Sequence, residues 1–373
     1  MGHPYQIAVR LVILVPARCP WGLRSRIGLE TGGDVMKRMV LVAAIVAMTG
    51  SAFAADMPLK AVKAPAPAPF DPWDIAFGAA AMNDYLFRGI TQSNHNPSVA
   101  AYFEPRYNVT KDLQLYIGTS TESISFANRA AAEVDVYGGI RPTFGAFAFD
   151  VGVWGYLYPA GSCADNVLTA GVPGGGVCPV STTTIFLANG NVMKKDVSYF
   201  EVYGKLNYTI NDNWQFGLNE YYSPNFLNSG AWGDYASVTG KYTAPATIFG
   251  TSGVGMYVSG EFGRQFLGTT DSFYGTTFTN PGFAGPFPNG IKYADYNTWN
   301  IGIGFTYKVF TLDLRYSDTD LSKANCNAFT SAFNSAGTSN ITSINPTGAG
   351  SNWCGAAGIA KLSADLTAMT NLK

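Results

Sequence analysis

The chain has 373 residues, a formal net charge of −1, 13% charged residues and 14% aromatic residues. The chain has no excess of basic residues to neutralise phosphates, which argues against a nucleic-acid partner. An apolar share of 47% argues against disorder. Beyond residue 54 no apolar run approaches the roughly 18 residues of a membrane-spanning helix, which excludes a polytopic helical membrane protein.

The first residues carry targeting information. Residues 36–54 contain, in order, a basic start at 36–38, an apolar run at 39–48 and small residues at 52–54, the three parts of a secretory signal peptide. Such signals span about 15–30 residues, so we interpret residues 1–35 as a mis-annotated upstream extension. An unusually long basic leader is the alternative. The Ala/Pro-rich residues 55–72 are predicted to form an extended periplasmic linker.

From Trp73 onward, apolar and polar residues alternate with a period of two, which predicts strands with two different faces. Twelve candidate strands follow in chain order. They lie near residues 73–88, 98–107, 113–120, 133–141, 147–157, 200–208, 214–219, 237–242, 254–262, 298–306, 310–316 and 360–366.

Charges keep to one face of these strands. In the first strand, the apolar face holds Ile75, Phe77, Ala79, Ala81, Tyr85 and Phe87, and the polar face holds Asp74, Asp84 and Arg88. A Lys or Arg facing lipid at the membrane midplane costs about 2–4 kcal/mol. The charged face is therefore predicted to point into the lumen of a barrel, with aromatic residues at the strand ends forming interfacial girdles.

The connections alternate in length. Short ones are predicted at 110–111, 142–145, 211–213, 244–247 and 308–309, and longer ones near 91–97, 122–131, 159–195, 224–232, 265–293 and 319–354. Short periplasmic turns and long extracellular loops are typical of outer-membrane barrels. A soluble β-sandwich gives no reason for such sorting. The prediction is an all-β, antiparallel transmembrane barrel of about twelve strands over residues 73–369, in the cell outer membrane.

Four motifs carry a resemblance to a known family. They lie at 83–92, 133–139, 200–226 and 312–320, the last followed by Cys326. Together they resemble the TorF family of proteobacterial outer-membrane proteins, whose members are named as porins, over about residues 73–366. The resemblance implies an outer-membrane barrel. It implies neither a solute nor established site residues.

The predicted lumen carries both signs of charge. The candidates for pore-lining residues are Asp84, Arg88, Glu104, Arg106, Glu133, Asp135, Arg141, Glu201, Lys205, Glu261, Asp313 and Arg315, joined in the lumen by Asp74, Asp150, Asp365, Lys241 and Lys361. The excess of acids over bases predicts a weak preference for cations. The alternative is that these residues form ion pairs that plug the barrel. For Arg88, a pair with Asp84 or Glu104 is the favoured interpretation.

Four cysteines follow the signal segment, and export lets them pair. Proximity predicts disulfides between Cys163 and Cys178 and between Cys326 and Cys354, each within one long loop. Four cysteines allow three pairings, so this prediction rests on spacing alone. Without close C-x-x-C spacing or a nearby histidine, no metal site is predicted.

The predicted function is passive diffusion of small hydrophilic solutes or ions. The alternative is a plugged structural or adhesion barrel whose loops bind partners. An enzyme is not predicted, because His95, in a polar turn, is the one histidine after the signal segment. No cofactor is expected. The expected partners are outer-membrane lipid, the solutes, and the secretion and barrel-assembly machinery.

Overall fold

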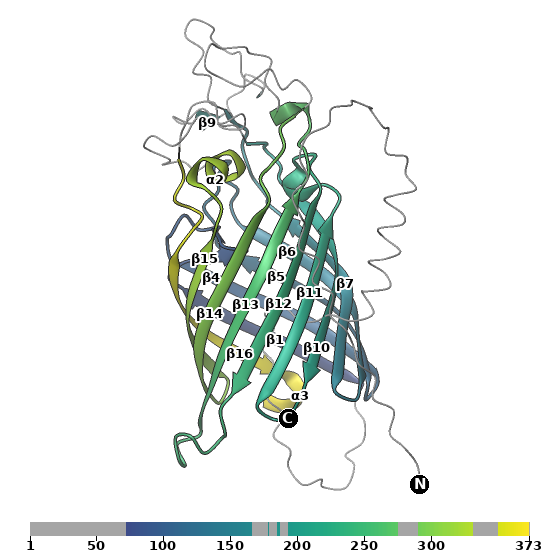
Figure 1. The fold of residues 1–373 in the computed structure, drawn as a ribbon. Helices are drawn as coiled ribbons and strands as arrows, with labels where there is room; N and C mark the ends of the chain where they lie inside the picture. Colours follow the sequence, from purple (N-terminus) through teal and green to yellow (C-terminus); the bar gives the residue numbers. More distant parts are fainter. Residues whose placement is uncertain are drawn as a thin grey trace, which may run out of the picture. The chain divides into compact units, whose positions relative to one another are not determined.

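The computed structural model describes residues 72–165, 178, 185–186, 193–274, 290–330 and 350–372. The predicted extension 1–35, the signal peptide 36–54 and all but the last residue of the linker 55–72 lie outside this part of the chain. Within the described residues, twelve strands close into one antiparallel barrel, as predicted (Figure 1).

Neighbouring strands in the barrel are consecutive in the chain, and the last pairs with the first. The strands are β1 (Trp73–Met82), β4 (Ser98–Thr110), β5 (Leu113–Glu122), β6 (Glu133–Phe144), β7 (Phe147–Leu157), β10 (Tyr199–Thr209), β11 (Trp214–Ser223), β12 (Gly233–Thr243), β13 (Val254–Leu267), β14 (Tyr296–Tyr307), β15 (Phe310–Thr319) and β16 (Ala357–Thr367).

Shorter elements occupy the connections. They are β2 (Leu86–Phe87), β3 (Ile90–Thr91), β8 (Ala164–Asp165), β9 (Ile185–Phe186), the 3-10 helices η1 (Phe226–Asn228) and η2 (Ser272–Tyr274), and the helices α2 (Lys323–Thr330) and α3 (Ala368–Asn371). None of the helices in the described segments is long and apolar enough to cross a membrane.

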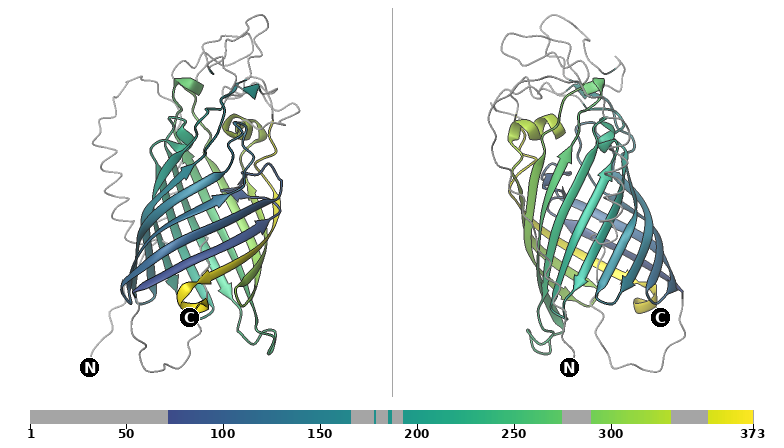
Figure 2. Two further views of the ribbon diagram at one scale, coloured as in Figure 1. Left: turned by 180° about the vertical axis from the view of Figure 1, so that it is seen from behind. Right: turned by 45° about the vertical axis from the view of Figure 1, so that its right-hand side comes forward.

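The two rims differ. Short turns and α3 lie at one rim, and the described parts of the long connections, with α2, lie at the other (Figure 2). We call the two parts of the lumen the short-turn half and the long-loop half. One turn is longer than predicted: β12 and β13 are joined by residues 244–253 instead of 244–247. Within this connection, Ile248 N donates to Pro245 O and Gly250 N donates to Thr247 O, so the chain forms successive turns instead of one short turn.

The outer face of the barrel is apolar. Val99, Ile117 and Ile301 are each about 60% exposed there, at 61%, 60% and 59%. Exposed aromatic side chains mark the short-turn rim, among them Trp73, Tyr107, Tyr208, Trp214 and Tyr307. An apolar band edged by aromatic residues is the surface of a transmembrane barrel, and it confirms the predicted facing of the strands.

Inside, several tyrosines lie against glycines of a neighbouring strand. A Cβ atom at Gly304 would lie 2.0 Å from Cζ of Tyr257, and one at Gly263 would lie 2.2 Å from the hydroxyl of Tyr235. The same arrangement occurs for Tyr102 on Gly78, Tyr137 on Gly118, Tyr116 on Gly139 and Tyr203 on Gly152. Because these glycines have no side chain, the tyrosine rings can lie flat along the wall instead of extending into the lumen.

The first strand ends earlier than predicted. β1 stops at Met82, because the side chain of Asn83 accepts from Ala360 N (2.6 Å) and donates to Gly358 O (2.9 Å), in place of continued strand pairing. The chain then turns into the barrel. Tyr85 and Phe87, which the alternation placed toward lipid, contact Glu133 and Tyr156 instead. Their predicted orientation was wrong.

Candidate functional site

The long-loop half of the lumen contains a small hairpin formed by β2 and β3. Its turn residues, Arg88 and Gly89, have φ values of 49° and 77°. Two left-handed residues in succession fit the turn types that join two antiparallel strands most tightly. Backbone bonds hold the hairpin to adjacent loops: Thr91 N donates to Trp353 O (2.9 Å), and Ser125 N donates to Gln92 O (2.8 Å).

A polar cluster at the base of the hairpin strengthens this attachment. Asp84 accepts hydrogen bonds from Thr91 Oγ1 (2.5 Å) and Ser93 Oγ (3.0 Å). His95 Nδ1 lies 2.7 Å from Asp84 Oδ2, and its Nε2 lies 2.8 Å from Asn352 O. With both nitrogens engaged, His95 ties two loops together, whereas the sequence indicated a simple surface turn.

At the tip of the hairpin, Arg88 reaches across the lumen to Glu201 on β10. Its Nη1 and Nη2 lie 2.8 and 2.7 Å from the two carboxylate oxygens, and Nη1 also lies 3.0 Å from Gln265 Oε1. The exposed fraction is 6% for the Arg88 side chain and 0% for Glu201. The predicted pairing of Arg88 with Asp84 or Glu104 was therefore wrong, because the hairpin leaves the wall on which those partners were expected.

Aromatic rings enclose the same guanidinium. Arg88 Cζ lies 4.5 Å from the ring centres of Phe87 and Tyr235 and 4.9 Å from that of Tyr221. Such rings stabilise a cation through their negative faces. In the strand order of the closed barrel, β10, β11 and β12 lie opposite β1, the strand that leads into the hairpin. We call this contact the Arg88–Glu201 bridge.

Three carboxylates lie together beneath the loops. Atoms of Glu122, Glu133 and Asp135 are all within 4.8 Å of one another, and Glu122 lies directly opposite Glu133 in the strand register. Tyr85 and Tyr158 each donate to Glu133, at 2.7 and 3.0 Å. Burial, and next the charge of Glu133, raise the pKa of both tyrosines well above the ordinary value, so both remain donors.

Among the described residues, this acidic group is the arrangement whose oxygen ligands could hold a cation such as Ca²⁺. Acidic groups of this kind also occur without an ion, and we assign it no function. Glu133 and Asp135 were predicted from the sequence to lie in the lumen, and Glu122 was not. The alternation of its strand, continued by two residues beyond Ser120, would have placed Glu122 in the lumen.

In the short-turn half, ion pairs follow the wall. Glu104 accepts from Arg106 Nε (2.6 Å) and Arg141 Nη1 (2.7 Å), and Arg141 Nε also reaches Asp150 (3.2 Å). The exposed fraction is 17% for the side chain of Arg106 and 23% for that of Arg141. These two cations therefore contact solvent inside the barrel.

A second wall network lies on β13, β14 and β15. Arg315 donates to Asp313 (3.0 Å), Asn300 (2.5 Å) and Ser259 (2.9 Å). The Arg315 and Asp313 side chains are 15% and 13% exposed. On β13, Glu261 accepts from Tyr235 (3.1 Å). Lys205, by contrast, is fully buried, with its Nζ 4.6 Å from the ring of Tyr203.

The predicted lumen residues thus fall into two groups. Arg88 is at the tip of the hairpin and Asp84 at its base, whereas the other candidates are on strands and point inward as the alternation indicated. Whether they line a conducting pore stays a prediction.

Apolar side chains from several loops pack together in the long-loop half. Ile90, Phe126, Phe226, Tyr293 and Trp353 belong to one buried cluster contributed by different loops. Disulfides join Cys163 to Cys178 and Cys326 to Cys354, the pairs that spacing predicted. Since Cys354 also forms a β-bridge with Ile90, the second disulfide lies next to the attachment of the hairpin.

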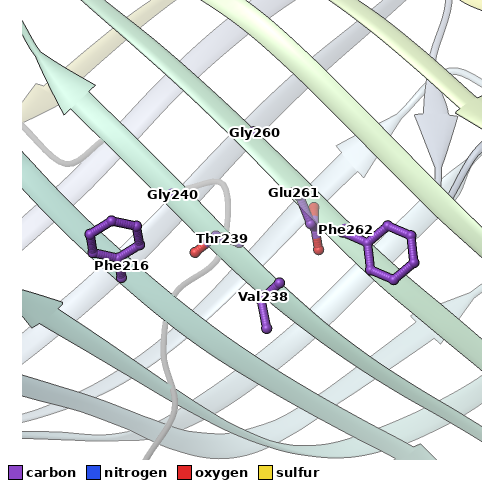
Figure 3. Close-up of a pocket in the computed structure, with 7 residues that line it drawn as sticks. All are labelled: Phe216, Val238, Thr239, Gly240, Gly260, Glu261 and Phe262. Carbon is purple, nitrogen blue, oxygen red and sulfur yellow. The ribbon is translucent and has the colours of Figure 1, made fainter. Parts of the chain in front are cut away.

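The wall bears a shallow groove at β11, β12 and β13. It is lined by Phe216, Val238, Thr239, Gly240, Gly260, Glu261 and Phe262 (Figure 3). Val238 and Phe262 are more than half exposed, at 51% and 53%, and lie on the apolar outer face. The apolar side of the groove is therefore a surface for membrane hydrocarbon.

Comparison with known proteins adds little beyond the fold. Residues 66–184 are similar to the family Gcw_chp, described as a bacterial protein of unknown function. No curated protein matches the chain. The TorF resemblance stays a prediction.

Several solved outer-membrane proteins are similar at low identity. An outer membrane channel from Pseudomonas putida F1 is 10% identical, with 80% of this chain and 97% of that chain covered and a TM-score of 0.38. LpxR from Salmonella typhimurium is 8% identical, with 78% and 99% covered and a TM-score of 0.34. OmpT of Vibrio cholerae is 12% identical, with 80% and 99% covered and a TM-score of 0.33. These similarities carry no argument about function.

Proposed function

We propose that the protein is a narrow outer-membrane channel of the TorF type for small hydrophilic solutes or ions, in a closed conformation. The observation that carries the proposal is the exposure of Arg106, Arg141 and Arg315 inside the barrel, at 17%, 23% and 15%. Charged side chains that contact solvent inside a barrel whose outer face is apolar support a water-filled entrance at the short-turn half.

The proposed location follows from the same features. An apolar band, aromatic girdles and alternating connections support insertion in the outer membrane, with short turns toward the periplasm. The signal peptide proposed at 36–54 would supply export. The secretion and barrel-assembly machinery are then the proposed partners during biogenesis.

Selectivity is a finer part of the proposal. The count of lumen charges predicts a weak cation preference. However, Glu104 and Glu201 are 1% and 0% exposed, whereas the solvent-contacting pairs include three arginines. We therefore expect a reversal potential close to zero under a salt gradient. Glu133→Gln with Asp135→Asn should shift it toward anions if these two residues lie at the constriction.

The alternative is a plugged structural or adhesion barrel. The buried apolar cluster and the Arg88–Glu201 bridge in the long-loop half support this alternative. Planar-bilayer recording of the full chain, purified from bacterial outer membranes, separates the two. Conductance steps support the channel, whereas silence from folded barrels, together with strong binding of a partner at the cell surface, would support the alternative.

A further inference from the structure

The Arg88–Glu201 bridge spans the lumen between two differently held parts of the molecule. On one side, the hairpin is fixed by backbone bonds to residues 353 and 125 and by the Asp84–His95 contact. On the other side stands the regular wall of β10. Between these fixed parts, the guanidinium of Arg88 is carried by a long side chain with several rotatable bonds. A change in its side-chain rotamers is therefore enough to break the contact, without moving the hairpin.

We propose that the ion pair between Arg88 and Glu201 gates the channel. The side chain of Arg88 is the part that moves, and Glu201 holds it in the closed position. This inference rests on the proposed channel function. In the closed state, the two hydrogen bonds to Glu201 hold the guanidinium across the lumen. In the open state, Arg88 turns along the lumen axis toward the solvent that reaches Arg106 and Arg141. The hairpin stays in place and narrows the opening.

Charge and burial favour two distinct positions of the Arg88 side chain, one bound to Glu201 and one in solvent. A buried ion pair is favourable only while both partners are present, and removal of one leaves an uncompensated charge in a poorly solvated site. Without the Glu201 charge, Arg88 retains its hydrogen bond to Gln265 Oε1 and three aromatic ring faces. These neutral partners interact more weakly with a cation than a bidentate carboxylate does. The guanidinium should then leave for water.

The arginines of the short-turn half do not form ion pairs across the lumen. Arg315 and Asp313 lie two residues apart on one strand, and Arg141 contacts Glu104 and Asp150 from a neighbouring part of the wall. These pairs run along the wall, so breaking one of them removes no obstacle from the lumen. Asp313→Asn therefore provides a comparison that changes the lumen charge by the same amount as Glu201→Gln.

The test is single-channel recording in planar bilayers on the full chain and on Glu201→Gln, Arg88→Gln, Asp313→Asn and the charge-swapped pair Arg88→Glu with Glu201→Arg. Folding of each variant is checked by its heat-dependent migration on gels. We expect Glu201→Gln and Arg88→Gln to raise the open fraction by about tenfold or more, equivalent to about 1.4 kcal/mol. The swapped pair should bring it back toward the wild-type value, and Asp313→Asn should alter step size or selectivity instead.

The possible failures are distinguishable. If the wild type conducts and neither Glu201→Gln nor Arg88→Gln raises the open fraction, the gate is overturned and the channel remains. An equal rise in Asp313→Asn would also overturn the gate, because charge alone would then explain the effect. If folded wild type and all four variants are silent, the channel function itself fails.

Discussion

The two halves of the lumen are built from the same residue types and differ in how these are connected. In the long-loop half, a hairpin and several loops meet in the interior, and Arg88 contacts the strands opposite β1. In the short-turn half, arginines pair with acids along the wall and remain 15–23% exposed. In the proposed channel, contacts across the lumen close it, whereas contacts along the wall leave space for solvent.

The largest expected effect comes from removal of the Cys326–Cys354 disulfide, which lies beside the attachment of the hairpin. Replacement of both cysteines by serine should weaken closure of that loop by about 3–4 kcal/mol. We expect faster protease cleavage in 319–357 and faster hydrogen exchange at Thr91. The urea midpoint of the barrel should change little. An unchanged hydrogen-exchange rate at Thr91 would show that the disulfide does not support the long-loop half.

A second variant tests the bridge as a structural contact. Arg88→Lys keeps the charge but cannot donate two parallel hydrogen bonds to Glu201. Loss of one such bond should weaken the contact between residue 88 and Glu201 by about 1.5–3 kcal/mol while the hairpin stays in place. Single-channel recording measures this effect as a higher open fraction, and the hydrogen exchange of the hairpin amides should not change. If the open fraction matches that of the wild type, the bidentate geometry does not hold the closed state.

The short-turn half can be disturbed through its glycines. Gly304→Ala would place a methyl group 2.0 Å from the ring of Tyr257, so the ring must move into the lumen. We expect a loss of stability of about 1–3 kcal/mol, seen as a lower urea midpoint. Gly358→Ala is the matched control, because a Cβ there meets no atom within 4 Å. Equal effects in both variants would contradict the proposed packing of tyrosines on glycines.

The smallest expected effect concerns the acidic group. Glu122→Gln removes a like charge that lies opposite Glu133 in the register. The barrel should gain about 0.2–1 kcal/mol in stability, because such pairs repel across strands. Urea unfolding at neutral pH measures this gain. A clear loss of stability would mean that the three carboxylates are held together by a bound cation.

Sequence patterns predicted the wall of the barrel well. Alternation placed the inward and outward residues of each strand correctly, because a period of two leaves few alternatives once lipid excludes charge. The same pattern failed after Met82. Residues 84–88 continue the alternation by chance, while Asn83 ends the strand pairing and Arg88 and Gly89 form a turn. Local periodicity cannot show that a segment leaves the wall.

The partner of Arg88 could not be found for a related reason. Glu201 lies 113 positions further along the chain, and only the closed strand order brings the two together. The wall pairs were easier to anticipate, because Arg106 lies two residues from Glu104 and Arg315 lies two residues from Asp313. The disulfides were also within reach, since each pair lies in one loop.

Single-channel recording of the wild-type chain beside Glu201→Gln tests the central claim most directly. A narrow channel closed by the Arg88–Glu201 bridge predicts brief, infrequent steps in the wild type and long openings of similar size in the variant. A wide pore that stays open in the wild type would contradict the closed state. Silence of both proteins in folded form would contradict the channel.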